Sequence, residues 1–199
     1  LCGVVGLKTT WGRISSAGAA PLSWSVSTVG PITSTANDAA LAYSFLAGPD
    51  PKQLLTQNQP PVELRDFGDA NLTGVKLGVF SAWFNHASTD IVQSCERMLD
   101  AFKSQGAVVE EIEIPELNEA RIAHVVTNGT EMLTSLQANF KTFRQPFGLD
   151  ALLKLTLEKE FSGSDYVKAQ RIRAQLIRNL TQIFQRVDAI VTPTTACTA

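Results

Sequence analysis

The chain of 199 residues has little of what most catalytic motifs and metal sites require. It contains only two histidines and three cysteines. The cysteines, Cys2, Cys95 and Cys197, lie far apart and form no Cys-x-x-Cys pair. No His-Glu-x-x-His, Gly-x-Ser-x-Gly, Walker A or Gly-x-Gly-x-x-Gly pattern occurs. We therefore expect no metal and no organic cofactor, and we interpret the cysteines as small buried thiols in a reducing, intracellular compartment.

A strong charge of either sign is also missing. Seventeen basic and 19 acidic residues give a formal net charge of −2, so charge indicates neither a nucleic acid nor an anionic membrane as a partner. No apolar run approaches the length that spans a bilayer. The hydrophobic fraction of 44% is nevertheless high enough for a real core.

The middle of the chain has the pattern of a strand–helix–strand unit. Residues 75–80 and 107–114 are rich in β-forming side chains. Between them, Ile91, Cys95 and Phe102 recur at helical spacing. Because strand, helix and strand follow within this length, the two strands should be parallel and joined by a right-handed crossover. The pattern predicts an α/β fold.

The remaining elements follow from the same rules. Helices are predicted over residues 117–139, 149–157 and 165–186, and a last strand over 187–192. Residues 49–73 are rich in proline, glutamine and asparagine, which is typical of a surface loop with at most one short helix.

The first fifty residues combine an apolar run, a loop and a helix. Residues 2–7 are small and apolar and predict a buried strand. Residues 8–20 are crowded with glycine, serine and threonine, which predicts a loop held by side-chain hydrogen bonds, with Arg13 bonded to backbone carbonyls. Thr35 and Asp38 form a capping pattern that opens a helix.

These fifty residues resemble the second half of the amidase signature. The resemblance rests on GVVGLKTTWGR at residues 3–13, on Val29-Gly30-Pro31, and on the helix that follows Asp38. Five further short motifs resemble those of plant-type fatty acid amide hydrolases. They are WFN at 83–85, PEL at 115–117, AHV at 123–125, the stretch 162–166 and VTPTT at 191–195.

The resemblance implies a fold and an activity. The fold would be an α/β/α sandwich with a mixed, mainly parallel sheet, to which this chain contributes at least four strands. The family's serine nucleophile, bridging serine and lysine match positions upstream of Leu1. We therefore expect residues 1–199 to be a C-terminal-side fragment of a single amidase domain, with no catalytic residue of its own and no activity alone.

The implied substrate is a small lipid amide such as an N-acylethanolamine, cleaved to fatty acid and amine. The resemblance leaves open a homodimer, and membrane association through the missing N-terminal part. Two alternatives remain: the A subunit of glutamyl-tRNA amidotransferase, and a catalytically silent amidase-like binding protein. The motifs after residue 75 resemble those of the lipid-amide hydrolases more than those of the amidotransferase subunit.

Four apolar side chains are candidates for the substrate pocket: Trp24, Trp83, Phe84 and Met132. They would line an acyl-chain channel, whereas ordinary packing is the alternative.

Polar candidates for catalysis are few. Lys8 with Ser15 or Ser16 would make a Ser–Lys pair only if the lysine were desolvated, and a structural role is favoured. His86 is expected on the surface of a loop. His124 is expected to be buried on a helix, with its ring nitrogens hydrogen-bonded.

Overall fold

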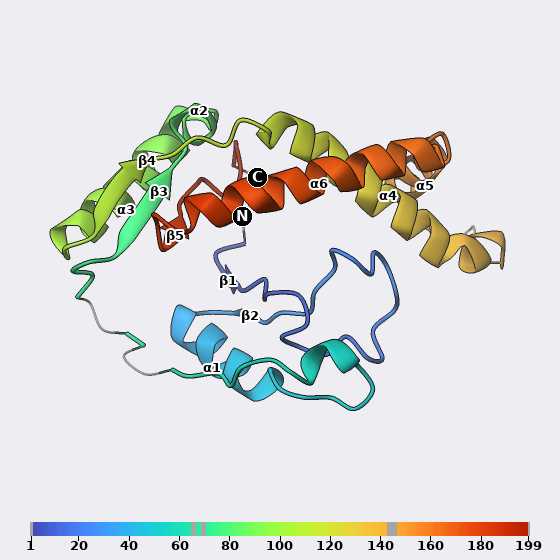
Figure 1. Cartoon of the computed structure of the whole chain (residues 1–199), viewed down its shortest axis with the longest axis horizontal. Helices are drawn as coiled ribbons and strands as arrows, with labels where there is room; N and C mark the ends of the chain where they lie inside the picture. The colour runs from blue at the N-terminus through green and yellow to red at the C-terminus, as the bar shows by residue number, and fades with distance from the viewer. Residues whose placement is uncertain (1, 65–66, 69–70, 143–146, 199) are drawn as a thin grey trace. The chain divides into compact units, whose positions relative to one another are not determined.

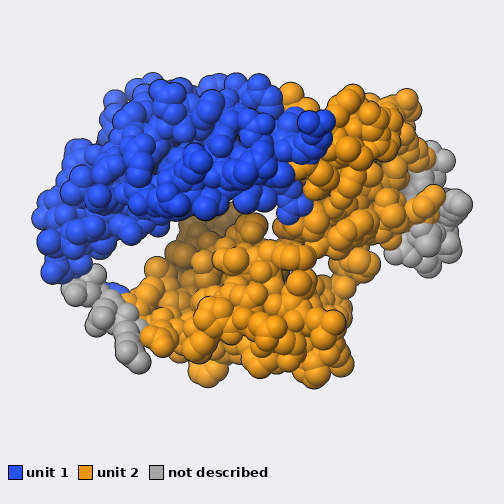
Figure 2. All heavy atoms as spheres, viewed as in Figure 1, with its two compact units in different colours: residues 1, 68–121, 171–199 blue, residues 2–67, 122–170 orange. Residues whose placement is uncertain are grey.

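The computed structural model describes the chain except residues 1, 65–66, 69–70, 143–146 and 199 (Figure 1). The chain divides into two compact units (Figure 2). Unit 1 comprises residues 68–121 and 171–199, and unit 2 comprises residues 2–67 and 122–170.

Unit 1 is built on a parallel sheet of three strands in the order β4-β3-β5 (Figure 1). The strands are β3 (Lys76–Val79), β4 (Val108–Glu111) and β5 (Ala189–Ile190). Two helices, α2 (Ser81–Phe84) and α3 (Thr89–Ser104), connect β3 to β4. The pairing of Lys76 with Val108 through Val79 with Glu111 is parallel. This confirms the predicted strand–helix–strand unit and the α/β class.

The core of unit 1 explains why the helical spacing was informative. Val79, Phe84 and Leu99 form one buried cluster. The α3 residues Cys95 and Phe102 pack against that cluster from the predicted apolar face. A second cluster, of Ile112, Ile114 and Val187, lies at the end of β4 and the start of β5.

Unit 2 is mostly loops and helices. Strand β1 (Val5–Gly6) pairs antiparallel with β2 (Ile32–Thr33). Helix α1 (Ala36–Leu46) follows, and η1 (Leu54–Thr56) is a single 3₁₀ turn. The Thr35 hydroxyl accepts from the Asp38 amide at 3.1 Å, which is the predicted N-cap.

Three longer helices complete the chain: α4 (Leu117–Thr142), α5 (Leu149–Glu158) and α6 (Gly163–Ile183). Helix α5 belongs to unit 2, whereas α4 and α6 supply residues to both units. None of the helices within the described residues is long and apolar enough to cross a membrane.

Several expectations about burial were wrong. Residues 2–7 form no buried strand: Val4 is 53% exposed and only two residues pair. The physical reason is that β1 has one partner, β2, over two residues, so most of the segment is left uncovered. Cys2 and Cys197 are exposed free thiols, and Cys95 is half-buried.

The strand count also differs from the expectation. The described residues form three strands in the parallel sheet and two in a separate antiparallel pair, rather than four or more in one sheet. The last strand is shorter than predicted and pairs only through Ala189 and Ile190.

Candidate functional site

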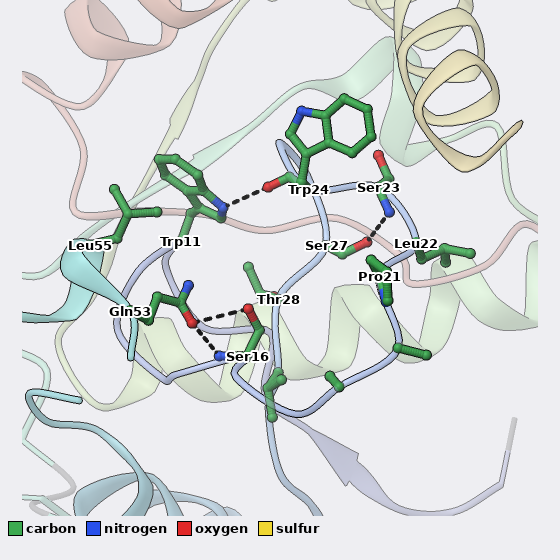
Figure 3. Close-up of a pocket in the computed structure, with 13 residues that line it drawn as sticks. Trp11, Ser16, Pro21, Leu22, Ser23, Trp24, Ser27, Thr28, Gln53 and Leu55 are labelled. Atoms are coloured by element: carbon green, nitrogen blue, oxygen red, sulfur yellow. Dashed lines mark hydrogen bonds between the residues drawn. The ribbon is translucent and has the colours of Figure 1, made fainter. Parts of the chain in front are cut away.

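A pocket of about 650 Å³ lies within unit 2. It is formed by the loop between β1 and β2 together with the segment around η1 (Figure 3). The residues that line it are Trp11, Ser16, Ala19, Ala20, Pro21, Leu22, Ser23, Trp24, Ser27, Thr28, Val29, Gln53 and Leu55.

Hydrogen bonds fix the shape of this loop, as the density of serine and threonine predicted. The buried Thr9 hydroxyl donates to the Val29 carbonyl at 2.9 Å. The Trp11 indole N–H donates to the Trp24 carbonyl at 3.2 Å, which links the two aromatic residues (Figure 3). These bonds join the two ends of a loop that has no regular secondary structure between β1 and β2.

A tight turn at residues 23–27 holds Trp24 in place. The Ser23 carbonyl accepts from the Ser27 amide at 2.8 Å and from the Val26 amide at 3.3 Å. The Ser23 amide donates to the Ser27 hydroxyl at 3.3 Å (Figure 3). The opposite wall is tied by Gln53, whose side-chain oxygen accepts from the amide and hydroxyl of Ser16.

The lining is mainly apolar and carries no charge. Among the lining residues, Trp11, Leu22, Trp24 and Leu55 are large apolar residues that are 46%, 43%, 55% and 43% exposed. The polar groups among the lining residues are hydroxyls and one amide, with no acidic or basic side chain. Such a pocket suits a neutral ligand with an apolar part.

Behind the Trp24 turn lies a buried carboxylate, Glu131 of α4, which is 1% exposed. Its Oε2 accepts from the Ser23 hydroxyl at 2.8 Å and from the Ser25 amide at 3.0 Å. Its Oε1 accepts from the Ser25 hydroxyl at 2.6 Å and from the Tyr166 hydroxyl at 2.9 Å. Each oxygen therefore receives two hydrogen bonds.

These contacts decide the ionisation of Glu131. Burial acts to raise its pKa, but the hydrogen bonds from Ser25, Ser23 and Tyr166 together hold that pKa below the ordinary glutamate value. The group is therefore an anion at neutral pH, satisfied by neutral donors. Ser23 is fully buried, and its hydroxyl is occupied by this carboxylate.

The four predicted pocket residues fall in both units. In unit 2, Trp24 lines the pocket, and Met132 is buried on α4 beside Glu131 in the sequence. In unit 1, Phe84 is buried in the core, and Trp83 lines a second cavity of about 290 Å³. A shared role of the four as an acyl channel stays a prediction.

The second cavity places His86 and Arg121 beside Trp83. The His86 ring stacks on the Trp83 ring, with centroids 5.8 Å apart. The Arg121 guanidinium lies 5.2 Å from the Trp83 ring centroid, as a cation–π contact. His86 is exposed, as expected.

The other polar candidates have structural contacts. Lys8 donates to the Thr9 carbonyl at 3.3 Å, while Ser15 bonds to Asp50 and Ser16 to Gln53. The prediction of a buried His124 was wrong: it is exposed on α4, whose buried face runs through Ala123 and Thr127 instead.

Sequence reasoning missed Glu131 and its partners. The signal was present, because Ala120, Ala123, Thr127 and Glu131 recur at spacings of three and four along α4, all of them buried. A glutamate on such a stripe requires hydrogen-bond donors from elsewhere in the chain. Nothing in the sequence identifies Ser23, Ser25 and Tyr166 as those donors.

Comparison with known proteins finds relatives that match the whole length of this chain. A fatty acid amide hydrolase of Medicago truncatula is 38% identical over 207 residues, covering 100% of this chain and 34% of the relative. One from Oryza sativa subsp. indica is 39% identical with the same coverage. The A subunit of a glutamyl-tRNA(Gln) amidotransferase from Prochlorococcus marinus is 28% identical and covered over 46% of its length. The chain thus spans about a third of the length of the plant relatives.

Solved structures match the fold. The crystal structure of the A subunit of glutamyl-tRNA(Gln) amidotransferase from Thermotoga maritima superposes with a TM-score of 0.79 at 24% identity, over 100% of this chain and 44% of that one. A crystal structure of an amidase gives 0.78 at 24% identity, over 98% and 42%. The Amidase family model matches residues 1–199 in full, so the chain belongs to the amidase family.

Proposed function

We propose that the complete protein containing this chain hydrolyses fatty acid amides such as N-acylethanolamines to a fatty acid and an amine. The observation that carries the proposal is the uncharged pocket of unit 2, lined by Trp11, Leu22, Trp24 and Leu55. The similarity to plant fatty acid amide hydrolases supports the same substrate class.

The chemistry would be that of a serine amidohydrolase. A serine attacks the amide carbonyl, the C–N bond breaks as the amine leaves with a proton, and water then hydrolyses the acyl-enzyme. We propose that the nucleophile, the bridging serine and the lysine lie in sequence outside these 199 residues. In the proposed enzyme this chain supplies the wall that receives the acyl part of the substrate.

The pocket also favours this substrate over that of the amidotransferase. Free glutamine is a zwitterion and a tRNA is a polyanion, so a site for either should present charged partners. The lining of the pocket within the described residues presents none. An acyl chain needs only apolar surface, which the two tryptophans and two leucines provide.

The test is the activity of the complete protein on N-acylethanolamines of increasing acyl length. Each methylene that enters the pocket should raise kcat/KM by about fourfold, since burying one methylene contributes about 0.8 kcal/mol. Trp24→Ala and Trp11→Ala should flatten this dependence. Phe45→Ala is the matched control, because Phe45 is 80% exposed on α1 and does not line the pocket.

Two results would contradict the proposal. One is hydrolysis of glutamine-type amides in preference to acyl amides. The other is a chain-length dependence that Trp24→Ala and Trp11→Ala leave as steep as in the wild type. A complete protein that binds acyl amides without cleaving them would support the silent binding protein instead.

A further inference from the structure

We infer that Glu131 is a positioning residue that sets the shape of the acyl pocket by holding the turn that carries Trp24. The inference rests on the proposed function, because it assigns Glu131 to the binding of the acyl part of the substrate. Glu131 does not line the pocket; it acts through Ser23 and Ser25.

The contacts of Glu131 flank Trp24 on both sides. Ser23 and Ser25 are the residues before and after Trp24, and both bind the same carboxylate. Ser23 is fully buried, whereas Trp24 is 55% exposed and lines the pocket. One buried carboxylate thus binds the residue on either side of Trp24, through the Ser23 hydroxyl and through the Ser25 amide and hydroxyl, and Trp24 itself lines the pocket.

The carboxylate is itself held at the other end by α6. The Tyr166 hydroxyl donates to Glu131 at 2.9 Å from the first turns of α6. That end of α6 is fixed by a capping box, in which the Asp165 amide donates to the Ser162 hydroxyl at 3.2 Å and the Ser162 amide to Asp165 at 3.1 Å. Glu131 therefore connects the Trp24 turn to α4, on which it lies, and to the first turn of α6.

A carboxylate suits this arrangement best. Four donor groups converge on two oxygens, and a carboxylate offers acceptors alone. A glutamine would present an NH₂ group to donors on one side and lose acceptor sites there. A glutamine can keep the Ser25 backbone N–H on its carbonyl oxygen, and the hydroxyls of Ser25 and Tyr166 can turn to accept from its NH₂ group. The charge-assisted hydrogen bonds are lost, however, so the turn is held less firmly. The expected consequence is a displaced Trp24 rather than a lost chemical group.

The test compares Glu131→Gln with wild type in the complete protein. We expect the KM for a long-chain N-acylethanolamine to rise roughly tenfold, since small displacements of a positioned group have effects of this order or larger. The kcat should change by less than about threefold, and the KM for a short-chain amide should be unchanged, because short chains do not reach the Trp24 wall.

Hydrogen exchange gives a readout that does not depend on turnover. The amides of residues 25–27 should exchange faster in Glu131→Gln than in wild type. Glu158→Gln is the matched control: Glu158 is also a buried glutamate of unit 2, 3% exposed, but lies on α5 and outside the pocket. It should leave both the exchange of 25–27 and the long-chain KM unchanged.

The outcomes separate the two proposals. Unchanged exchange of residues 25–27 in Glu131→Gln would overturn the inference, as would equal losses on short-chain and long-chain amides. If wild type cleaves no acyl amide, the proposed function fails, and the exchange data still show whether Glu131 holds the turn. If Glu131→Gln does not fold, Tyr166→Phe, which removes one donor and keeps the charge, must show the same selective rise in KM at smaller size.

Discussion

The carboxyl group of Glu158 on α5 lies against the backbone of Gly129 on α4. A Cβ added at Gly129 would come within 2.6 Å of the Glu158 Cγ, Cδ and Oε1 atoms. Glu158 is 3% exposed, so its side chain has no solvent-filled space to move into. The absence of a side chain at Gly129 is what allows α4 and α5 to approach at this point.

Gly129→Ala should therefore destabilise the protein. Helix propensity alone would favour alanine, but overpacking a filled site costs about 1–3 kcal/mol. The free energy of unfolding in denaturant measures the effect. Gly163→Ala is the control, since nothing lies within 4 Å of a Cβ there. In a Glu158→Ala background the same change at Gly129 should cost much less, and equal costs in both backgrounds would contradict the contact.

Glu158 should also make stability fall with rising pH. Burial raises the pKa of Glu158, and Lys154, 3.8 Å away and half-exposed, opposes this only in part. Neither carboxyl oxygen has a hydrogen-bond partner within the described part of the chain. The folded chain thus holds this proton more tightly than the unfolded chain, so stability is lost as pH rises from the ordinary glutamate pKa through the raised one.

Glu158→Gln should remove that loss. We expect the free energy of unfolding to rise by about 1–2 kcal/mol at neutral pH, of the order of the cost of an unsatisfied buried group, and not to change in acid.

Glu131→Gln should change stability in the opposite direction. The lowered pKa of Glu131 stabilises the folded chain above the ordinary glutamate value, and this stability is lost as pH falls through the lowered pKa. The melting temperatures of both variants, measured against pH and compared with wild type, test the two predictions. If both variants change the pH dependence in the same direction, the opposite pKa shifts of Glu131 and Glu158 are contradicted.

The fold of unit 1 was predictable because its signals are local. The apolar spacing from Ile91 to Phe102 and the β-forming residues at 75–80 indicate elements that the sheet then pairs in the predicted way. The Thr35 cap is equally local. The pocket and Glu131 were not predictable to the same degree, because Ser23 and Glu131 are 108 residues apart and no spacing links them. The exposed Val4 and Cys2 show the same limit, since burial depends on partners far along the chain.

Gly30 has the closest approach of any described glycine. A Cβ there would lie 1.9 Å from the Leu7 carbonyl oxygen, next to the bond from the Leu7 amide to the Pro31 carbonyl at 3.0 Å. A backbone carbonyl cannot move aside as a side chain can. Gly30→Ala should therefore break the β1–β2 pairing and lower the free energy of unfolding by about 3 kcal/mol or more. Gly6→Ala, with nothing within 4 Å of its Cβ, is the control on the paired strand. A normal unfolding free energy for Gly30→Ala would contradict this geometry.

Arg13 joins three separate segments of unit 2. Its Nε donates to the Tyr43 hydroxyl at 2.7 Å, and its guanidinium also donates to the Pro60 carbonyl. The sequence predicted backbone carbonyls as partners, and the structure shows one carbonyl and one hydroxyl. Arg13→Ala should lower the free energy of unfolding by about 1–3 kcal/mol, because the Tyr43 hydroxyl and the Pro60 carbonyl lose a charged hydrogen-bond donor.

Two further variants separate the bonds made by Arg13. Tyr43→Phe removes only the hydroxyl and keeps the ring, whose centroid lies 5.8 Å from the guanidinium, so it should lose less than Arg13→Ala. Arg13→Lys keeps the charge but cannot donate in two directions from a planar group, so it should fall between the two. If Arg13→Ala melts at the wild-type temperature, the loop does not depend on these bonds, and the glycine, serine and threonine contacts alone hold it.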